Sequence, residues 1–240
     1  MDDARLRAAI DASNLGGLDA SLRSALLAGA TRRRVAAGST MRGEGAGGAH
    51  LELVVDGFVR IFVSAPDGRT LTVRYARPGA LLGAVSLFRP AYALPGTIQA
   101  LVDADVLVIR PEVIRALAER DLQVAAAMLR ELSDRVLAFV EELPGTAFAT
   151  IRQRVARHLL DLASERQRGT LLVAEISQQG LADAIGSVRE VVVRVLRDLR
   201  QEGLVTTGSG TIVVVDPERL YGESFAAAAS ASGGTQVPAS

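Results

Sequence analysis

The segment from 112 to 143 contains neither glycine nor proline, and no other feature constrains the fold of this chain as strongly. Apolar residues recur along it at alternating steps of four and three positions, at Ala118, Leu122, Ala125, Leu129, Leu132, Val136, Phe139 and Leu143. Such a heptad repeat predicts a long helix whose apolar seam packs against another helix. We expect a parallel homodimer with an interface formed by Leu122, Ala125, Leu129, Leu132, Val136, Phe139 and Leu143. The alternative is a helix that is buried within its own chain.

The residues before this helix, 34–110, alternate short β-rich runs with turn dipeptides. These dipeptides are Asp56-Gly57, Asp67-Gly68 and Pro78-Gly79. Strands of this length and spacing predict a small antiparallel β-barrel, preceded by short helices at 3–10 and 19–29. The run 104–111 is expected to be the last strand, and Pro111 to open the long helix. Three residues that lie off the seam are expected to pack on the barrel, namely Met128, Leu137 and Val140.

A third pattern follows the long helix. Pro144-Gly145 is expected to end that helix and to form a hinge. The next helix is predicted over 150–166, with inward-facing residues at Ile151, Val155, Leu159, Leu160 and Leu162. The segment 204–220 predicts a β-hairpin that turns at Gly208-Ser209-Gly210. The tail from Ser224, rich in alanine, serine and glycine, has nothing to bury and is expected to be disordered.

Composition excludes several classes of site. The chain has no cysteine, which excludes disulfides, thiolate metal sites and cysteine-held iron–sulfur clusters. With only two histidines, a cupin-like metal enzyme is disfavoured, and we predict no metal, no cofactor and no enzymatic activity. The sequence lacks a secretory signal and a long apolar run, so we expect a cytoplasmic protein without a membrane partner. Basic and acidic residues balance at 27 each, so any site for nucleic acid must be a local one.

The stretch 177–205 carries such a local signal. Two amphipathic segments flank Gly186, a residue that can adopt positive φ in a tight turn. In the second segment, 187–200, one face is apolar, with Val188, Val191, Val192, Val195, Leu196 and Leu199. The opposite face is mainly basic, with Arg189, Glu190, Val193, Arg194, Arg197 and Arg200. This pattern predicts a helix-turn-helix whose second helix enters the DNA major groove.

The chemistry of these side chains fits base recognition. Arginine can bind guanine with two hydrogen bonds, and glutamate can accept one from cytosine, which are roles we predict for Arg189, Arg194 and Glu190. Val193 is placed to touch a thymine methyl group. Ser177 and Gln178, at the start of the first helix, are placed to meet phosphate.

Two simpler interpretations of the same residues remain open. Ser187, which we include among the candidate DNA contacts, also forms an S-x-x-E capping box with Glu190. Glu190 and Arg194 are four residues apart and could pair with each other on a solvated face.

Three stretches carry a resemblance to a known family: 38–46, 64–88 and 181–205. They resemble the cyclic-AMP receptor protein and fumarate–nitrate regulator (CRP/FNR) family of bacterial transcription factors. The run 186–194 is similar to the family pattern G-x-S-R-E-T-V-x-R, which places the family's base-reading residues on Arg189, Glu190 and Arg194. The chain departs from this pattern at Val188 and Val191, where the family has hydroxyl side chains.

The resemblance also implies an effector pocket, formed by Leu82, Gly83, Ala84, Val85, Ser86, Phe139 and Val140. In cAMP-binding members, a phosphate-binding cassette begins Gly-Glu and ends in Arg-Ser. Here Ala84 replaces the glutamate of the cassette turn (residues 83–88), and the segment 94–97 holds no arginine. Phe139 and Val140 stand where an adenine-binding Thr-Ser pair is expected. We therefore predict no cAMP response, and an apolar cavity that either accepts an uncharged or lipid-like effector or is filled by side chains.

Together these observations predict an α+β fold. A β-barrel (jelly-roll) effector domain with short N-terminal helices is expected over 1–115, a dimerisation helix over 116–143, a winged helix-turn-helix over 144–221 and a disordered tail over 222–240. The predicted function is a homodimeric transcriptional regulator of a palindromic double-stranded DNA site. In the family, contact with RNA polymerase at promoters is common, so activation and repression both stay open. The alternative is a ligand-binding or scaffolding dimer that does not regulate transcription.

Overall fold

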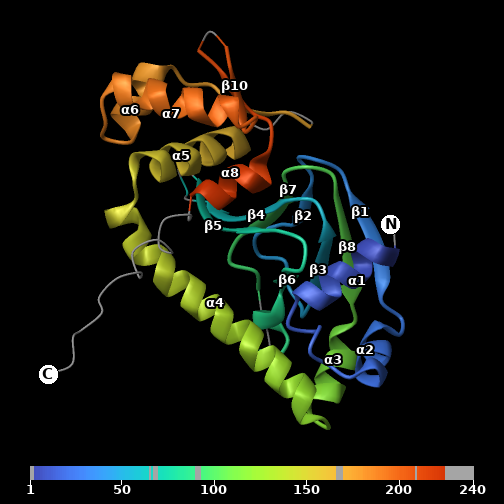
Figure 1. Cartoon of the computed structure of the whole chain (residues 1–240). Coiled ribbons are helices and arrows are strands. Elements are labelled where there is room, and N and C mark those ends of the chain that lie inside the picture. The colour runs from blue at the N-terminus through green and yellow to red at the C-terminus, as the bar shows by residue number, and fades with distance from the viewer. Residues whose placement is uncertain are drawn as a thin grey trace, which may run out of the picture. The chain divides into compact units, whose positions relative to one another are not determined.

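The structure is a computed structural model that describes residues 3–64, 66, 70–89, 93–165, 170–208 and 210–224, the side chains of 141–148 and 165 excepted. It divides into two compact units (Figure 1). The first comprises Met1–Glu141 with Gln167–Thr170, and the second Glu142–Arg166 with Leu171–Ser240.

The first unit contains two antiparallel four-stranded sheets, ordered β1-β8-β3-β6 and β2-β7-β4-β5. The strands are β1 (Thr31–Val35), β2 (Thr40–Arg42), β3 (Leu51–Asp56), β4 (Val59–Ser64), β5 (Thr70–Ala76), β6 (Leu81–Leu82), β7 (Thr97–Ala100) and β8 (Ala104–Ile109). A short 3-10 helix, η1 (Ala84–Ser86), follows β6 in the cassette turn. The predicted antiparallel barrel domain is confirmed.

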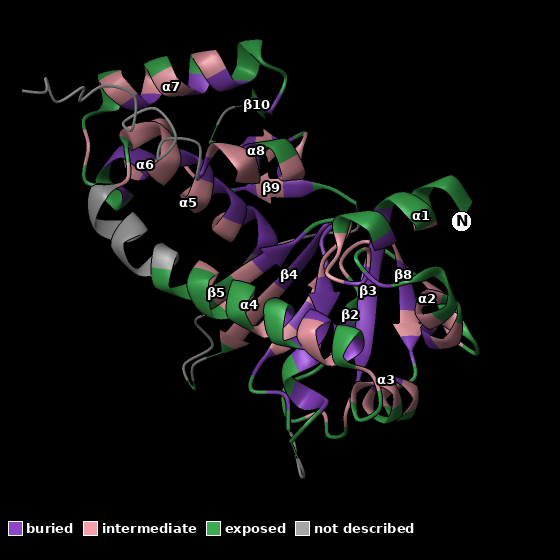
Figure 2. Cartoon of the chain, turned by 60° about the horizontal axis from the view of Figure 1, so that its bottom comes forward, coloured by how far each residue is buried: buried purple, intermediate pink, exposed green. Residues whose placement is uncertain are grey.

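Strand β3 separates two apolar cores because successive side chains point to opposite faces of a sheet. Val54 joins Val59, Leu82 and Val106 in one cluster. Leu53 and Val55 join the other cluster, which includes residues of α1 (Asp3–Ala12), α2 (Ala20–Leu27), α3 (Pro111–Ala118) and α4 (Leu122–Phe148). β3 is therefore buried on both faces, as its colour in Figure 2 shows.

The helical region after the barrel differs from the prediction at both ends. Instead of one helix over 112–143, the structure has α3 and α4, separated at 119–121. Asp121 accepts a hydrogen bond from the amide of Gln123 (2.8 Å), which favours a new helix start there. Ala118 therefore belongs to α3 and not to the seam of α4.

The prediction that Pro144-Gly145 ends the long helix is also wrong. Helix α4 continues through both residues to Phe148. A proline removes one backbone donor and bends a helix, but neighbouring hydrogen bonds can carry the helix past it. The link between α4 and α5 (Ile151–Glu165) is thus short, at 149–150.

The second unit contains α5, α6 (Gln178–Ala184), α7 (Arg189–Gln201) and α8 (Pro217–Glu223) around a small sheet. That sheet has the order β10-β11-β9, with β9 (Leu172–Ala174), β10 (Val205–Thr207) and β11 (Ile212–Val214). The predicted hairpin corresponds to β10 and β11, whereas β9 and α8 were not predicted. On α5, the residues Val155, Leu159 and Leu160 are buried as predicted, but Ile151 and Leu162 are only half-buried.

Helix α8 had a signal in the sequence. Asp216 accepts a hydrogen bond from the amide of Arg219 (3.0 Å), and Pro217 occupies the first turn. This Asp-Pro pair is typical of a helix start.

No helix in the described ranges is both long and apolar enough to cross a membrane. The predicted disorder beyond Ser224 falls on residues outside the described ranges.

Candidate nucleic-acid interface

The turn between α6 and α7 has the geometry that the sequence predicted. Gly186 has a φ of 63°, in the left-handed region that favours glycine. The amide of Ser187 donates to the carbonyl of Ala182 (2.9 Å), which closes the C-terminal turn of α6. At the other end of α6, the hydroxyl of Ser177 accepts from the amide of Gly180 (3.0 Å). Ser177 therefore caps α6.

Helix α7 begins at Arg189 without such a cap. Its N-cap residue is Val188, and no side chain caps the helix there. Ser187 lies one residue too early to serve. The capping-box interpretation of Ser187 and Glu190 is therefore wrong.

One face of α7 is buried and the other carries charge. Val192, Leu196 and Leu199 are buried, whereas the exposed residues of the helix are Arg189, Glu190, Arg194, Arg197, Arg200 and Gln201. Val191 and Val195 are half-buried, and Val188, predicted on the apolar face, is 59% exposed. The charged face is thus the one that the helical pattern predicted.

The charged residues at the start of α7 do not pair with one another. In the part of the chain that the structure describes, Arg189, Glu190 and Arg194 form no ion pair. The predicted alternative, a Glu190–Arg194 pair on a solvated face, is therefore not observed. Further along, Arg200 Nη1 lies 3.5 Å from Thr207 Oγ1 and connects α7 to β10.

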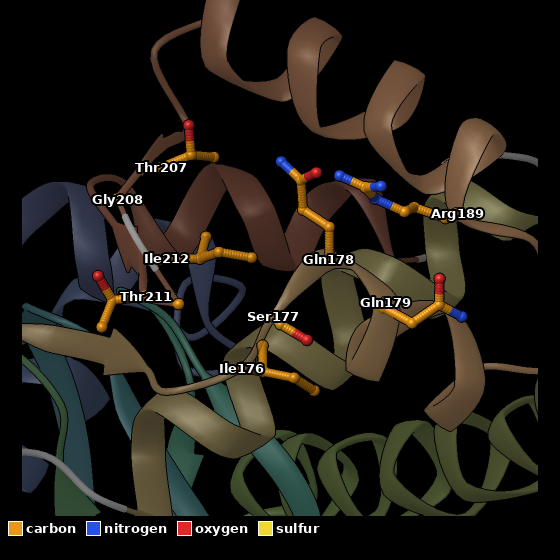
Figure 3. A pocket seen from close by; sticks show the side chains of 10 residues that line it. Ile176, Ser177, Gln178, Gln179, Arg189, Thr207, Gly208, Thr211 and Ile212 are labelled. Atoms are coloured by element: carbon orange, nitrogen blue, oxygen red, sulfur yellow. The ribbon is translucent and has the colours of Figure 1, made fainter.

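A cavity of about 250 Å3 lies between α6, α7 and the β10–β11 hairpin. Figure 3 shows the side chains of Gln178 and Arg189 extending toward each other across it. Ser177 lines the same cavity, and so do the hairpin residues Thr207 and Thr211. Three predicted site residues from two helices therefore lie together, beside hydroxyl groups that the sequence analysis did not select.

A smaller hollow of about 70 Å3 adjoins α7. It is lined by Gln178, Val193, Leu196, Arg197, Arg200 and Thr207. Val193 is half-buried in this hollow rather than fully exposed on the helix. Arg197 and Arg200 were noted on the basic face but not selected as site residues, and their position beside Gln178 adds them to the candidate interface.

The residues predicted for the effector pocket are dispersed. Leu82 belongs to one core cluster and Ala84 to the other. Val85 is 48% exposed and Phe139 and Val140 are 57% and 51% exposed, so these three lie on the surface of the single chain. Phe88, the last residue of the cassette turn, is also half-exposed. The predicted pocket is therefore not assembled within one chain.

The cassette turn is held by polar contacts with the start of β3. Ser86 Oγ accepts from the amide of His50 (2.9 Å) and donates to the carbonyl of Gly83 (2.7 Å). Gly83 has a φ of 90°, and a Cβ there would stand 2.3 Å from the His50 ring. His50 is buried; this burial lowers its pKa, and the nearby Arg42 guanidinium lowers it further. His50 thus has a structural role in packing the turn.

The seam of α4 lies on the surface of the chain. Leu122, Leu129, Val136 and Phe139 are between 57% and 87% exposed, and Ala125 and Leu132 are half-buried. The opposite face, with Val124, Ala127 and Met128, is buried in the first unit. The alternative of a fully buried helix is therefore wrong. The expected packing of Met128 on the barrel domain is confirmed, but Leu137 and Val140 are exposed, and Leu143 lies outside the described side chains.

No cluster of three or more histidine, aspartate or glutamate side chains able to hold a metal occurs among the described residues.

Comparisons with known proteins agree with the two-part architecture. Residues 32–121 match the model of the cyclic nucleotide-binding domain, and residues 153–222 match the Crp-like helix-turn-helix domain.

Curated relatives share this organisation over most of their length. The chain is 35% identical over 176 residues to the transcriptional regulator LdrP of Thermus thermophilus, covering 72% of this chain and 86% of that protein. It is 30% identical over 195 residues to the cAMP-activated global transcriptional regulator Vfr of Pseudomonas aeruginosa, covering 79% and 91%.

Solved structures show the same fold. The c-di-GMP-responsive global regulator CLP of Xanthomonas campestris superposes with a TM-score of 0.52 at 27% identity, over 82% of this chain and all of that one. A CRP/FNR-family structure from Eubacterium rectale gives a TM-score of 0.55 at 22% identity, over 87% and 96% of the two chains.

Proposed function

The chain belongs to the CRP/FNR family of DNA-binding transcriptional regulators, and on that premise we propose that it acts as a homodimer that reads a palindromic DNA site and does not respond to cAMP. It is a regulator and not an enzyme. The observation that carries the proposal is the start of α7, where Arg189, Glu190 and Arg194 are exposed and form no ion pair among the described residues.

These three side chains are available to bind DNA because they are exposed and form no ion pair within the described chain. Arg189 and Arg194 can each bind a guanine edge with two hydrogen bonds, and Glu190 can accept from a cytosine amino group. Gln178, Arg197 and Arg200 line the adjoining hollow. We assign Ser177, Gln178, Ser187, Arg197 and Arg200 to the phosphate backbone, where they would fix the register of α7.

The seam of α4 supports the proposed homodimer. Leu129, Val136 and Phe139 are exposed at heptad spacing, while the other face of the helix is packed in its own unit. A second copy can cover this seam by parallel coiled-coil packing. Two-fold symmetry then presents two copies of α7 to half-sites about one helical turn apart.

The cassette turn supports a regulator that is not activated by cAMP. A cyclic phosphate needs a cation, but Leu94, which stands in the segment where the family has that arginine, is buried in an apolar cluster. Ala84 stands where the ribose-binding glutamate is expected, and it too is buried in a core cluster. Burying a phosphate in such surroundings costs several kcal/mol.

The relatives respond to different molecules, so membership of the family does not fix an effector. One is described as cAMP-activated and another as c-di-GMP-responsive. In this chain, an effector would have to be uncharged or lipid-like, or side chains take its place. A cytoplasmic location and contact with RNA polymerase belong to the same proposal.

Selection of bound duplexes from a random DNA pool tests the function, performed with and without cAMP, cGMP and c-di-GMP. We expect an inverted repeat whose enrichment is the same in every pool. A requirement for cAMP would contradict the assignment of the cassette turn. A chain that dimerises but enriches no sequence would instead be the scaffolding dimer of the alternative hypothesis.

A further inference from the structure

We propose that two arginines of α5, Arg154 and Arg152, position the recognition helix α7 for DNA from outside its DNA-facing surface. This inference rests on the proposed function, since it concerns how the same helix is aimed. Both arginines belong to α5 within the second unit, one contacting the turn before α7 and the other the C-cap residue after it.

Arg154 holds the turn that leads into α7. Its Nη1 donates to the carbonyl oxygen of Ile185 at 2.6 Å. Ile185 is the C-cap residue of α6, where carbonyl groups have no partner within the helix and carry the negative end of its dipole. A guanidinium at this place satisfies the carbonyl and fixes the residue directly before Gly186.

Arg154 also lies close to Gly186 itself. A Cβ placed on Gly186 would have Arg154 Nη1 as its nearest neighbour, at 3.8 Å, with no other atom within 4 Å. The start of α7 has no side-chain cap of its own. The guanidinium therefore lies against the turn, beside the backbone bond from Ser187 to Ala182 that closes it.

The charge of Arg154 is not balanced by a carboxylate. Within the described ranges it forms no ion pair, and its Nε is buried without a hydrogen-bond partner. Partial burial of an unpaired guanidinium costs free energy. An arginine that only stabilised the fold would do so better in an ion pair. The contact of Arg154 with a backbone carbonyl therefore points to a positioning role.

Arg152 holds the other end of α7. Its Nη2 lies 2.6 Å from Glu202 Oε2, and its Nε lies 2.7 Å from Glu223 Oε2 in α8. Glu202 is the C-cap residue of α7. Helix α5 therefore contacts the turn that precedes α7, at Ile185, and the C-cap residue that follows α7, and two such contacts set the direction of a helix.

The test compares two substitutions that remove the same charge from α5. In the full-length protein, Arg154→Met removes the contact with Ile185, whereas Arg157→Met removes a neighbouring arginine that lines the same surface hollow. Affinity is measured for the selected DNA site and for a random duplex of equal length, over a series of salt concentrations. The ratio of the affinity for the selected site to that for the random duplex measures how well α7 is positioned for base recognition. The affinity for the random duplex alone measures the electrostatic attraction to DNA.

We expect Arg154→Met to lower the affinity for the selected site about tenfold, which corresponds to about 1.4 kcal/mol. On the random duplex, it should match Arg157→Met. Arg154→Lys, which keeps a donor, should restore most of the ratio. Equal ratios for the two methionine variants would overturn the proposal.

A second variant covers the case in which Arg154→Met does not fold, as judged by thermal unfolding. Glu202→Gln weakens the hold at the other end and keeps the shape of the side chain. It should lower the ratio, although by less, and an unchanged ratio would also contradict the proposal. If the wild-type protein selects no site at all, the proposed function itself fails, before any variant is compared.

Discussion

The start of α7 and the cassette turn handle polar chemistry in opposite ways. On α7, Arg189 and Arg194 are exposed and free of ion pairs among the described residues. At the cassette turn, Ala84 and Ser86 are buried, and the serine hydroxyl is used by neighbouring backbone groups. Exposed charged side chains without an ion pair favour a ligand-binding surface on α7. Buried apolar or hydrogen-bonded side chains make the cassette turn part of the core.

This difference is best tested first on the seam, because α7 can act in pairs only if α4 dimerises. Val136→Glu places a charge at a position that the second copy would bury, which costs several kcal/mol in the dimer. We expect a monomer by analytical ultracentrifugation and a loss of specific DNA affinity of more than about a hundredfold. Leu137→Glu is the matched control, because Leu137 is similarly exposed but lies off the seam. Dimers that persist in Val136→Glu would refute the interface.

The surface half of the comparison is tested on α7. Arg189→Ala should weaken binding to the selected site by about 1–3 kcal/mol and relax the preference at one base pair. Arg197→Ala should weaken all duplexes alike and reduce the salt slope by about one. Fluorescence anisotropy on the selected site and on single-base variants measures both. Wild-type affinity in Arg189→Ala would exclude Arg189 as a base-reading residue.

The core half is tested at Leu94. Leu94→Arg buries a guanidinium in an apolar cluster, so we expect the free energy of unfolding to fall by about 2 kcal/mol or more. Leu94→Met, which keeps the volume, should lose less than about 1.5 kcal/mol. Chemical denaturation measures both. If cAMP binds to Leu94→Arg and restores its stability, the pocket is open and the contrast with α7 is weaker than we state.

The smallest expected effect concerns pH. Burial lowers the pKa of His50 below its ordinary value of 6.5, so the unfolded chain binds the proton more tightly. Stability should therefore be complete above about pH 6.5 and decline as the pH falls below it, by at most about 1.4 kcal/mol per pH unit. Denaturation of wild type and His50→Gln between pH 5 and pH 8 measures the decline, which should be shallower in the variant. Identical slopes would place the titration elsewhere.

The sequence predicted best where one periodic pattern decided the structure. The 3.6-residue period of α7 separated Val192 and Leu196 from the arginines, and Gly186 marked the turn. The sequence predicted less well where the surrounding structure overrides a local signal or where an element is very short. Pro144 ordinarily argues for a helix end, yet α4 passes through it, and three-residue β9 is too short to show a period.

The exposure of two apolar residues on α4 was also predicted wrongly. Leu137 and Val140 were expected on the barrel because they are apolar, but apolarity does not say which of two partners covers a side chain. The effector pocket stays a prediction, because the single chain does not bring its residues together. Leu82 and Ala84 are neighbours in sequence, but they belong to different core clusters, and only the three-dimensional arrangement reveals this.

Because α4 persists to Phe148, the stretch free to twist before α5 shrinks to Ala149 and Thr150, about four soft backbone torsions in all. Thr150 is itself committed to α5, since its amide donates to Gln153 and its hydroxyl accepts from the amide of Gln153. A glycine inserted at this two-residue link would add two soft backbone torsions to the connection between α4 and α5.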